Sequence, residues 1–415
     1  MIRSRLAFLK HIFYAVVALV CLLCALEVGL RVYTWRAGAV ASTDPADIPI
    51  RSSCRIAHHC LLPFEKAELA NPDTGQPILL RTNSRGLRGP EFETPKPSGM
   101  FRIVCLGDER TLGPGVDESE TFCARLEGLL GERSRLKVEV VNAGIPDYCP
   151  LLSFLQLRHS LLALQPDLVI VNFDMSDISD DYRHRRHTRM SESGVPLGCA
   201  DPLLACKTST AHRLEEQFLT VRWGRKQLGQ LPVSTNPAAD QGDISTPAGR
   251  YGWLRTNAPN WSVYIEQALA PLAQIGKLAD GSFARFVIAI CPAPWQVSPD
   301  ATNGKGVRTR LGIPEKGKFE SRRPIEILAH FTREHSLPVC NTYDPLLGAQ
   351  EPERLFLHNS PEFSPLGHEL YARLLAEYVL NKVSGIWVDP ADNSSDDAGD
   401  ATPRATSRNV RTSRQ

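Results

Sequence analysis

The sequence carries almost no excess of charge of either sign. Its 47 lysine and arginine residues nearly cancel its 46 aspartate and glutamate residues, which leaves a formal net charge of +1. A nucleic-acid surface needs a basic excess to attract phosphates. We therefore expect no nucleic-acid partner. The sequence also has no internal repeat, and its 42% hydrophobic content excludes disorder of the whole chain.

The C-x-x-C spacing typical of zinc-binding sites occurs only within one apolar N-terminal run, where a water-exposed metal site cannot form. Two cysteine pairs lie close together in loop-like sequence: Cys54 with Cys60, and Cys199 with Cys206. These spacings allow disulfides that staple loops in an oxidising compartment. Buried free thiols that act as small hydrophobes are an equally good interpretation. The sequence predicts no cofactor and no resident metal.

The N-terminal region contains a long apolar run. Residues 12–26 include no charged side chain, and the run continues to about the 20 residues that a membrane-spanning helix needs. Basic residues precede it, and Tyr33 and Trp35 follow it, so the positive-inside rule places the amino end in the cytoplasm. We predict a cytoplasmic end and transmembrane anchor over residues 1–36, with the main domain periplasmic or at the cell surface. A signal peptide cleaved near residues 39–41 is the alternative, and it also exports the domain.

The rest of the chain divides into a lead-in, a domain and a tail. Residues 37–100 are rich in proline, glycine and polar residues and are predicted to be an extended lead-in. Residues 101–385 form the predicted domain, in which residues 183–250 lack a clear period and indicate an insertion. Residues 386–415 are poor in aromatics and are predicted to be disordered.

Within the domain, short apolar runs alternate with helically spaced segments. Strands are predicted at residues 101–106, 138–141, 168–173, 286–291 and 337–341, and helices at residues 121–130, 151–164, 261–278, 324–335 and 367–383. This alternation predicts βαβ units and a mostly parallel sheet. Ligands of such sheets bind beyond the carboxyl ends of the strands.

Four short motifs follow the predicted strands or open the last helix. They are G-D-E-R-T-L-G (107–113), V-N-A-G (141–144), D-M-S-D (174–177) and S-P-L-G-H (364–368). In order and spacing they resemble the four sequence blocks of the SGNH, or GDSL-type, ester hydrolases. N-S-R-G-L-R-G (83–89) is similar to the segment that precedes the domain in membrane-anchored bacterial members. The resemblance implies an SGNH-hydrolase-like, flavodoxin-like three-layer α/β sandwich.

The catalytic positions of that family are replaced here. The family's first block carries a serine nucleophile, and its last block carries an aspartate and a histidine. Glu109 stands at the serine position and Glu362 at the histidine position, while Asn359 or Ser360 stands at the acid position. An acyl-enzyme mechanism needs a hydroxyl nucleophile and a base beside it. The resemblance therefore implies a protein with little serine esterase activity.

The oxyanion positions are retained only in part. The resemblance assigns Gly144 as a backbone donor, and it places Ser176 where the family usually has an asparagine donor. Asp177, which follows it, matches the family pattern.

Three hypotheses follow for the function. The first is a pseudohydrolase that keeps the cleft to bind a cell-envelope glycan or an acylated ligand. The second is altered chemistry, in which Glu109 and Glu362 face each other and share a proton or hold a divalent cation with Asp177. The third is an active ester hydrolase or acyltransferase with a displaced triad. Residues that could supply such a triad are Ser364, His358, His368 and Thr111.

Overall fold

The structure is a computed structural model. It describes residues 2–37, 48–202, 204, 220, 249–313, 318–383 and 387. Cys206, most of the predicted insertion and nearly all of the predicted tail lie outside the described residues.

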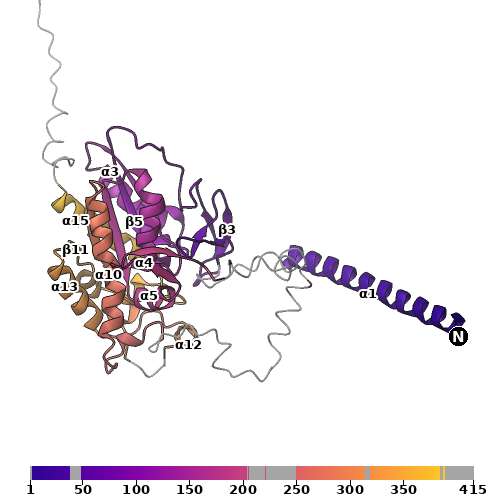
Figure 1. The fold of residues 1–415 in the computed structure, drawn as a ribbon. Coiled ribbons are helices and arrows are strands. Elements are labelled where there is room, and N and C mark those ends of the chain that lie inside the picture. Colours follow the sequence, from indigo (N-terminus) through magenta and orange to yellow (C-terminus); the bar gives the residue numbers. More distant parts are fainter. Residues whose placement is uncertain are drawn as a thin grey trace, which may run out of the picture.

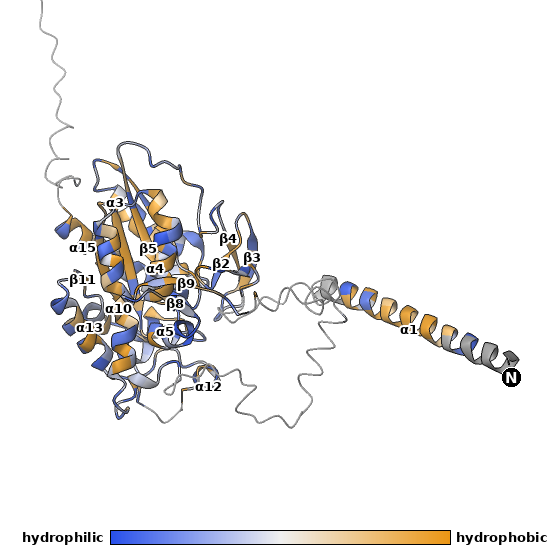
Figure 2. Cartoon of the chain, viewed as in Figure 1, coloured by the Kyte–Doolittle hydropathy of each residue, from blue (hydrophilic) through white to orange (hydrophobic). Residues whose placement is uncertain are grey.

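The N-terminal segment forms one long helix, α1 (Ile2–Ala37). Its stretch Phe13–Val32 is long and apolar enough to cross a membrane, and none of that stretch is buried against the rest of the chain. Figure 2 shows it as a nearly continuous hydrophobic rod that stands apart from the α/β unit. Glu27, which lies inside the stretch, pairs with Arg31 one turn later at 2.8 Å. This pairing lowers the cost of a carboxylate near the end of an apolar helix.

A five-stranded, fully parallel sheet forms the centre of the remaining chain (Figure 1). Its strands are β5 (Met100–Leu106), β6 (Lys137–Asn142), β7 (Leu168–Asp174), β10 (Arg285–Cys291) and β11 (Val339–Cys340). Read from β6, the order is 6-5-7-10-11, which is the flavodoxin-like order 2-1-3-4-5. The predicted mostly parallel sheet is confirmed.

Helices cover both faces of the sheet. On one face lie α3 (Phe122–Gly131) and α15 (Pro365–Lys382), and on the other lie α4 (Pro150–Gln156), α10 (Ser262–Asp280) and α13 (Arg323–Glu334). Strands that are covered on both faces are apolar throughout rather than alternating. All seven residues of β5 and all seven of β7 are accordingly buried. The predicted three-layer α/β sandwich is confirmed.

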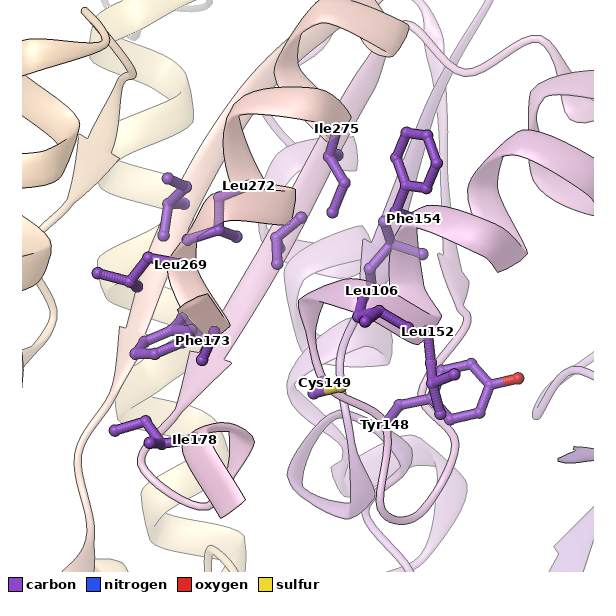
Figure 3. Packing of buried hydrophobic residues seen from close by; sticks show 14 of the residues in the cluster. Leu106, Tyr148, Cys149, Leu152, Phe154, Phe173, Ile178, Leu269, Leu272 and Ile275 are labelled. Carbon is purple, nitrogen blue, oxygen red and sulfur yellow. The ribbon is translucent and has the colours of Figure 1, made fainter. Parts of the chain in front are cut away.

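The alternation of side chains along β5 divides the core into two clusters. Phe101 and Ile103 pack with α3 and α15, whereas Val104 and Leu106 point to the opposite face. Figure 3 shows this second cluster, in which Leu269, Leu272 and Ile275 of α10 lie near Leu106 and Phe173.

The lead-in differs from the extended segment that the sequence predicted. Its described part contains two β-hairpins: β1 (Arg51–Ser53) pairs with β2 (His59–Leu61), and β3 (Lys66–Ala70) pairs with β4 (Pro77–Arg81). Apolar side chains of these hairpins form a small core against Leu112. Strands of three to five residues are too short for a period of two to stand out among turn-forming residues.

Shorter elements connect these units. They are α2 (Glu109–Leu112), α5 (Asp177–Arg185), α11 (Pro294–Val297), α12 (Val307–Arg310), α14 (Tyr343–Leu347), the antiparallel pair β8 (Thr188–Met190) and β9 (Pro196–Cys199), and the short helical turns η1 (Glu118–Glu120), η2 (Leu157–Leu161), η3 (Leu162–Leu164), η4 (Gly252–Leu254) and η5 (Pro352–Leu355). Several of them line the carboxyl edge of the sheet.

Candidate functional site

The carboxyl end of β5 turns sharply and places Glu109 at the edge of the sheet. Gly107 makes this turn, because a Cβ there would lie 2.2 Å from the hydroxyl of Thr111. The Asp108 side chain then accepts the Arg110 N–H at 2.9 Å and caps α2, so Glu109 becomes the first residue of that helix. Its side chain is 6% exposed.

Both carboxylate oxygens of Glu109 are engaged by other parts of the chain. Oε1 pairs with the Arg250 guanidinium, which comes from the end of the predicted insertion. Oε2 accepts the backbone N–H of Asp147 at 3.1 Å. The residue at the family's nucleophile position therefore holds two loops over the carboxyl edge of β5.

This ion pair belongs to a larger group, which we call the arginine–carboxylate network. Asp147 pairs with Arg51 at 2.7 Å and with Arg183 at 3.7 Å, and Arg183 also pairs with Asp180 at 2.9 Å. Arg250 lies 4.0 Å from both aspartates. The members are Arg51, Arg183, Arg250, Glu109, Asp147 and Asp180. Three cations balance three carboxylates, as buried charges require.

The network shifts the pKa of its aspartates in opposite directions. Burial alone would raise the pKa of Asp147, but Arg250, Arg183 and Arg51 together hold it below its ordinary range. For Asp180, burial outweighs the attraction of Arg183 and Arg250 and raises the pKa to about 7.

Three neutral histidines adjoin the network. His59 Nε2 lies 2.7 Å from the Pro146 carbonyl and His184 Nε2 lies 3.2 Å from the Asp147 carbonyl, so in each ring this nitrogen carries the proton and donates. His58 Nδ1 lies 2.9 Å from His59 Nδ1, which must then accept. Burial is the main cause that lowers the pKa of His58 to about 4 and that of His59 to about 3, and it lowers the pKa of His184 well below its ordinary value.

Glu362 reaches the same edge from the loop before α15. It is 2% exposed, and its Oε2 has no hydrogen-bond partner within the described part of the chain. Burial raises its pKa well above the ordinary value; Glu109 adds to the rise and Arg110 opposes it. Glu109 and Glu362 are therefore close enough to interact electrostatically, and burial disfavours the charged form of Glu362.

The two residues at the candidate acid position, Asn359 and Ser360, form hydrogen bonds that stabilise the loop before α15. The N–H of Asn359 donates to the Asp73 carboxylate at 2.7 Å, which ties this loop to the turn between β3 and β4. Ser360 accepts the Glu362 N–H at 3.5 Å through its hydroxyl, and its carbonyl accepts the Thr302 hydroxyl at 3.1 Å.

The predicted oxyanion positions are bonded within the protein. The Gly144 N–H donates to the Asn142 side chain at 3.1 Å. The Ser176 hydroxyl donates to Asp174 at 2.6 Å, and Asp177 accepts the Asp174 N–H at 2.9 Å. Burial, reinforced by Asp174, raises the pKa of Asp177 well above its ordinary value. A developing oxyanion would have to displace these bonds.

The side chains considered for a displaced triad have other partners. Ser364 caps α15 by accepting the Gly367 N–H at 3.2 Å, and His368 Nδ1 accepts the Phe122 N–H at 3.2 Å at the start of α3. Thr111 accepts from the Asn172 amide at 3.1 Å, and His358 is exposed. Among the described residues, no three His, Cys, Asp or Glu side chains are grouped as metal ligands.

Sequence analysis missed Arg250, which pairs with Glu109, and the lead-in residues that belong to or adjoin the arginine–carboxylate network. Arg250 lies 141 positions away in a segment without a period, and Arg51, His58 and His59 lie in the lead-in. Only Asp147 lies close to a recognisable motif, three residues after V-N-A-G, so only its position could have indicated the site.

Comparisons with known proteins give fold neighbours only. No family model and no curated protein matches the chain. The solved structures similar to it include the lipase/acylhydrolase from Enterococcus faecalis (13% identity, 68% of this chain, 97% of that chain, TM-score 0.38). They also include a GDSL-like lipase from Bacteroides thetaiotaomicron (11%, 68%, 88%, 0.34) and a catalytic mutant of an acetylxylan esterase from Geobacillus stearothermophilus (12%, 67%, 94%, 0.36). The activities in these descriptions are those of the neighbours.

Proposed function

We propose that this chain is a membrane-anchored, extracytoplasmic pseudohydrolase. It binds a cell-envelope glycan or an acyl-ester-type ligand at the carboxyl edge of its sheet and has little or no serine esterase activity. The observation that carries the proposal is the bonding of Glu109. A carboxylate stands at the nucleophile position, and Arg250 and the Asp147 N–H occupy both of its oxygens.

Esterase chemistry by the family mechanism lacks support at each step. The mechanism needs a hydroxyl, a base to take its proton, and donors aimed at the oxyanion. Glu109 supplies no hydroxyl, and Glu362 places a carboxyl group where the family has its histidine base. The Gly144 N–H and the Ser176 hydroxyl are already bonded within the protein. Loss of a whole triad costs about 10⁶ in rate.

The proposed ligand class and the proposed location of the domain are supported by different observations. The glycan or acyl ligand follows from the resemblance to GDSL-type hydrolases and from the rule that parallel sheets bind ligands at this edge. The extracytoplasmic placement follows from the basic residues before the apolar stretch of α1 and the aromatic residues after it.

The decisive experiment compares labelling by a fluorophosphonate probe and hydrolysis of p-nitrophenyl acetate. We expect neither with the natural chain. Glu109→Ser, Glu362→His and Asn359→Asp combined should create measurable probe labelling at residue 109, provided that circular dichroism shows a folded protein. Probe labelling of a serine in the natural chain would overturn the proposal and favour a displaced triad.

Ligand binding needs its own measurement. We expect titration calorimetry with acetylated and deacetylated oligosaccharides to show heat for at least one of them, reduced by Glu362→Gln and unchanged by Glu351→Gln on the exposed surface. Absence of heat with both would remove the ligand class while leaving the prediction of no esterase activity intact. Glycoside turnover lost in both Glu109→Gln and Glu362→Gln would instead favour a carboxylate-pair hydrolase.

A further inference from the structure

Two cysteine side chains meet in the hairpin of β1 and β2. The register places Ser52 opposite Cys60, so Cys54, two residues further along, lies diagonally across from Cys60 on the same face. Both side chains are partly exposed, and the thiols are close enough for each to shift the pKa of the other. Both are free thiols in this structure.

The two thiols have unequal surroundings. Cys54 Sγ accepts the backbone N–H of Ile56 at 3.4 Å, and the N–H groups of Ala57 and Arg55 also point to it. Such a turn of N–H groups stabilises an anion. The interaction with Cys60 is the largest cause that lowers the pKa of Cys54 to about 5, and the same interaction raises the pKa of Cys60. The N–H groups around Cys54 make it the better stabilised thiolate of the two.

We propose that Cys54 and Cys60 form a thiol–disulfide exchange site, with Cys54 as the attacking residue and Cys60 as the resolving residue. The oxidant is an external disulfide, either of a thiol–disulfide oxidoreductase or of a low-molecular-mass thiol. The Cys54 thiolate attacks one sulfur and releases the other as a thiolate. Cys60 then loses its proton to the solvent, attacks Cys54 Sγ and releases the second thiolate. The pair is oxidised to a disulfide, and the external disulfide is reduced to two thiols.

The site is coupled to the arginine–carboxylate network through its hairpin. Arg51 of β1 pairs with Asp147, and His59 of β2 donates to the Pro146 carbonyl. The Tyr148 hydroxyl donates to the His59 carbonyl at 2.6 Å. A Cys54–Cys60 bridge would therefore fix the hairpin that holds Arg51 against the loop bonded to Glu109.

The core contains a second thiol pair that serves as an internal control. Cys105 of β5 and Cys123 of α3 are also close enough to interact, but they are 0% and 2% exposed. Burial raises the pKa of Cys123 well above its ordinary value. Contact between thiols is thus common to both pairs, whereas access and the N–H donors distinguish Cys54 and Cys60.

The test uses the full chain in detergent, incubated with reduced or oxidised glutathione, quenched with acid and alkylated. Trypsin cleaves after Arg51, Arg55 and Lys66, so residues 52–55 and 56–66 become separate peptides that only the disulfide joins. We expect the joined peptide in oxidised glutathione and its loss in reduced glutathione, with Cys105 and Cys123 alkylated only after unfolding. Recovery of the two alkylated peptides from the oxidised sample would overturn the proposal.

Single substitutions test the order of attack. In Cys60→Ser we expect a stable glutathione adduct on Cys54 that forms at least about 10-fold faster than the adduct on Cys60 in Cys54→Ser. The reverse order would overturn the assignment. Formation of the disulfide in the cell assumes the extracytoplasmic location proposed above. That location is tested separately, by the thiol state of chain isolated from membranes. If glutathione forms the bridge in vitro but chain isolated from acid-quenched membranes carries two thiols, the exchange site stands and the extracytoplasmic placement fails.

Discussion

At the scale of single residues, the ion pair between Glu109 and Arg250 has a measurable consequence for stability. Glu109→Gln keeps the shape of the side chain but removes the charge that faces Arg250. Removing one partner of a buried pair leaves the other charge uncompensated. Asp147 and Asp180, each 4.0 Å from Arg250, compensate in part. We expect a loss of about 1–3 kcal/mol in the free energy of unfolding, measured by urea denaturation.

A surface ion pair supplies the matched control. Glu351 and Arg354 form a pair whose side chains are 55% and 63% exposed. Exposed pairs contribute little, so Glu351→Gln should change the free energy of unfolding by less than about 0.5 kcal/mol. Equal effects of the two substitutions would mean that Glu109 does not hold Arg250 in solution.

The pH dependence of stability tests the neutral histidines. Burial, followed by repulsion from Arg51, lowers the pKa of His59 from 6.5 to about 3. The unfolded chain therefore binds more protons between these values, and the contribution of His59, complete above pH 6.5, is lost as the pH falls. Asp180, whose pKa is raised to about 7, acts in the opposite direction over the upper part of this range. The comparison is therefore made between variant and natural chain.

His59→Gln removes the titrating group and keeps an amide that can donate to the Pro146 carbonyl. Between pH 6.5 and about pH 4, the stability deficit of the variant should shrink by about 3 kcal/mol, since each pH unit is worth about 1.4 kcal/mol. Urea midpoints measured across this range check the slope. A deficit that stays constant would show that His59 is protonated in the folded protein.

The sequence indicated the positions of the site but not its bonding. The resemblance implied that Glu109 and Glu362 face each other, because the family positions they occupy touch. In the structure, Glu109 contributes to the raised pKa of Glu362. The bonding could not be predicted, because Arg250, which pairs with Glu109, and Arg51, which pairs with Asp147, lie in segments that have no period and enter the site only through long-range packing.

At the scale of elements, two glycines give opposite predictions for the same substitution. A Cβ on Gly144 would lie 2.3 Å from the Leu112 backbone nitrogen and 2.7 Å from the Thr111 carbonyl carbon. Backbone atoms cannot yield as a flexible side chain can, so α2 or the end of β6 must shift. We expect Gly144→Ala to cost about 1–3 kcal/mol in thermal or urea unfolding.

Gly128 provides the comparison inside α3. A Cβ there meets nothing within 4 Å, and alanine favours a helix by about 0.5–1 kcal/mol over glycine. Gly128→Ala should therefore stabilise the protein by about that amount. A neutral Gly144→Ala would contradict the close packing of α2 against the end of β6, and a destabilising Gly128→Ala would contradict the open space around Gly128.

Elements with strong periods were predictable, and short ones were not. β5 and β7 are apolar runs buried on both faces, and α15 begins within the S-P-L-G-H motif that was predicted to open the last helix, so local sequence was sufficient. The hairpins of the lead-in depend instead on a small core shared with Leu112, which no local pattern reveals.

At the scale of the whole molecule, the apolar helix is suited to a lipid bilayer, whereas the α/β unit is suited to water. The 20 residues of Phe13–Val32 would span about 30 Å as a helix, the thickness of a bilayer core. The α/β unit keeps its apolar side chains inside two clusters. A chain that lacks residues 1–36 should therefore be soluble without detergent and keep the same melting temperature to within a few degrees.

Reporter fusions at the carboxyl end test the orientation of the full chain. Alkaline phosphatase folds only after export, whereas green fluorescent protein fluoresces only when it folds in the cytoplasm. We expect phosphatase activity and no fluorescence, because basic residues precede the apolar stretch. Both signals should depend on those charges: replacing Arg3, Arg5 and Lys10 by glutamate removes the asymmetry that retains the amino end and should lower the phosphatase activity severalfold. Fluorescence from the natural chain would place the α/β unit in the cytoplasm, where glutathione keeps thiols reduced and the Cys54–Cys60 bridge would not persist.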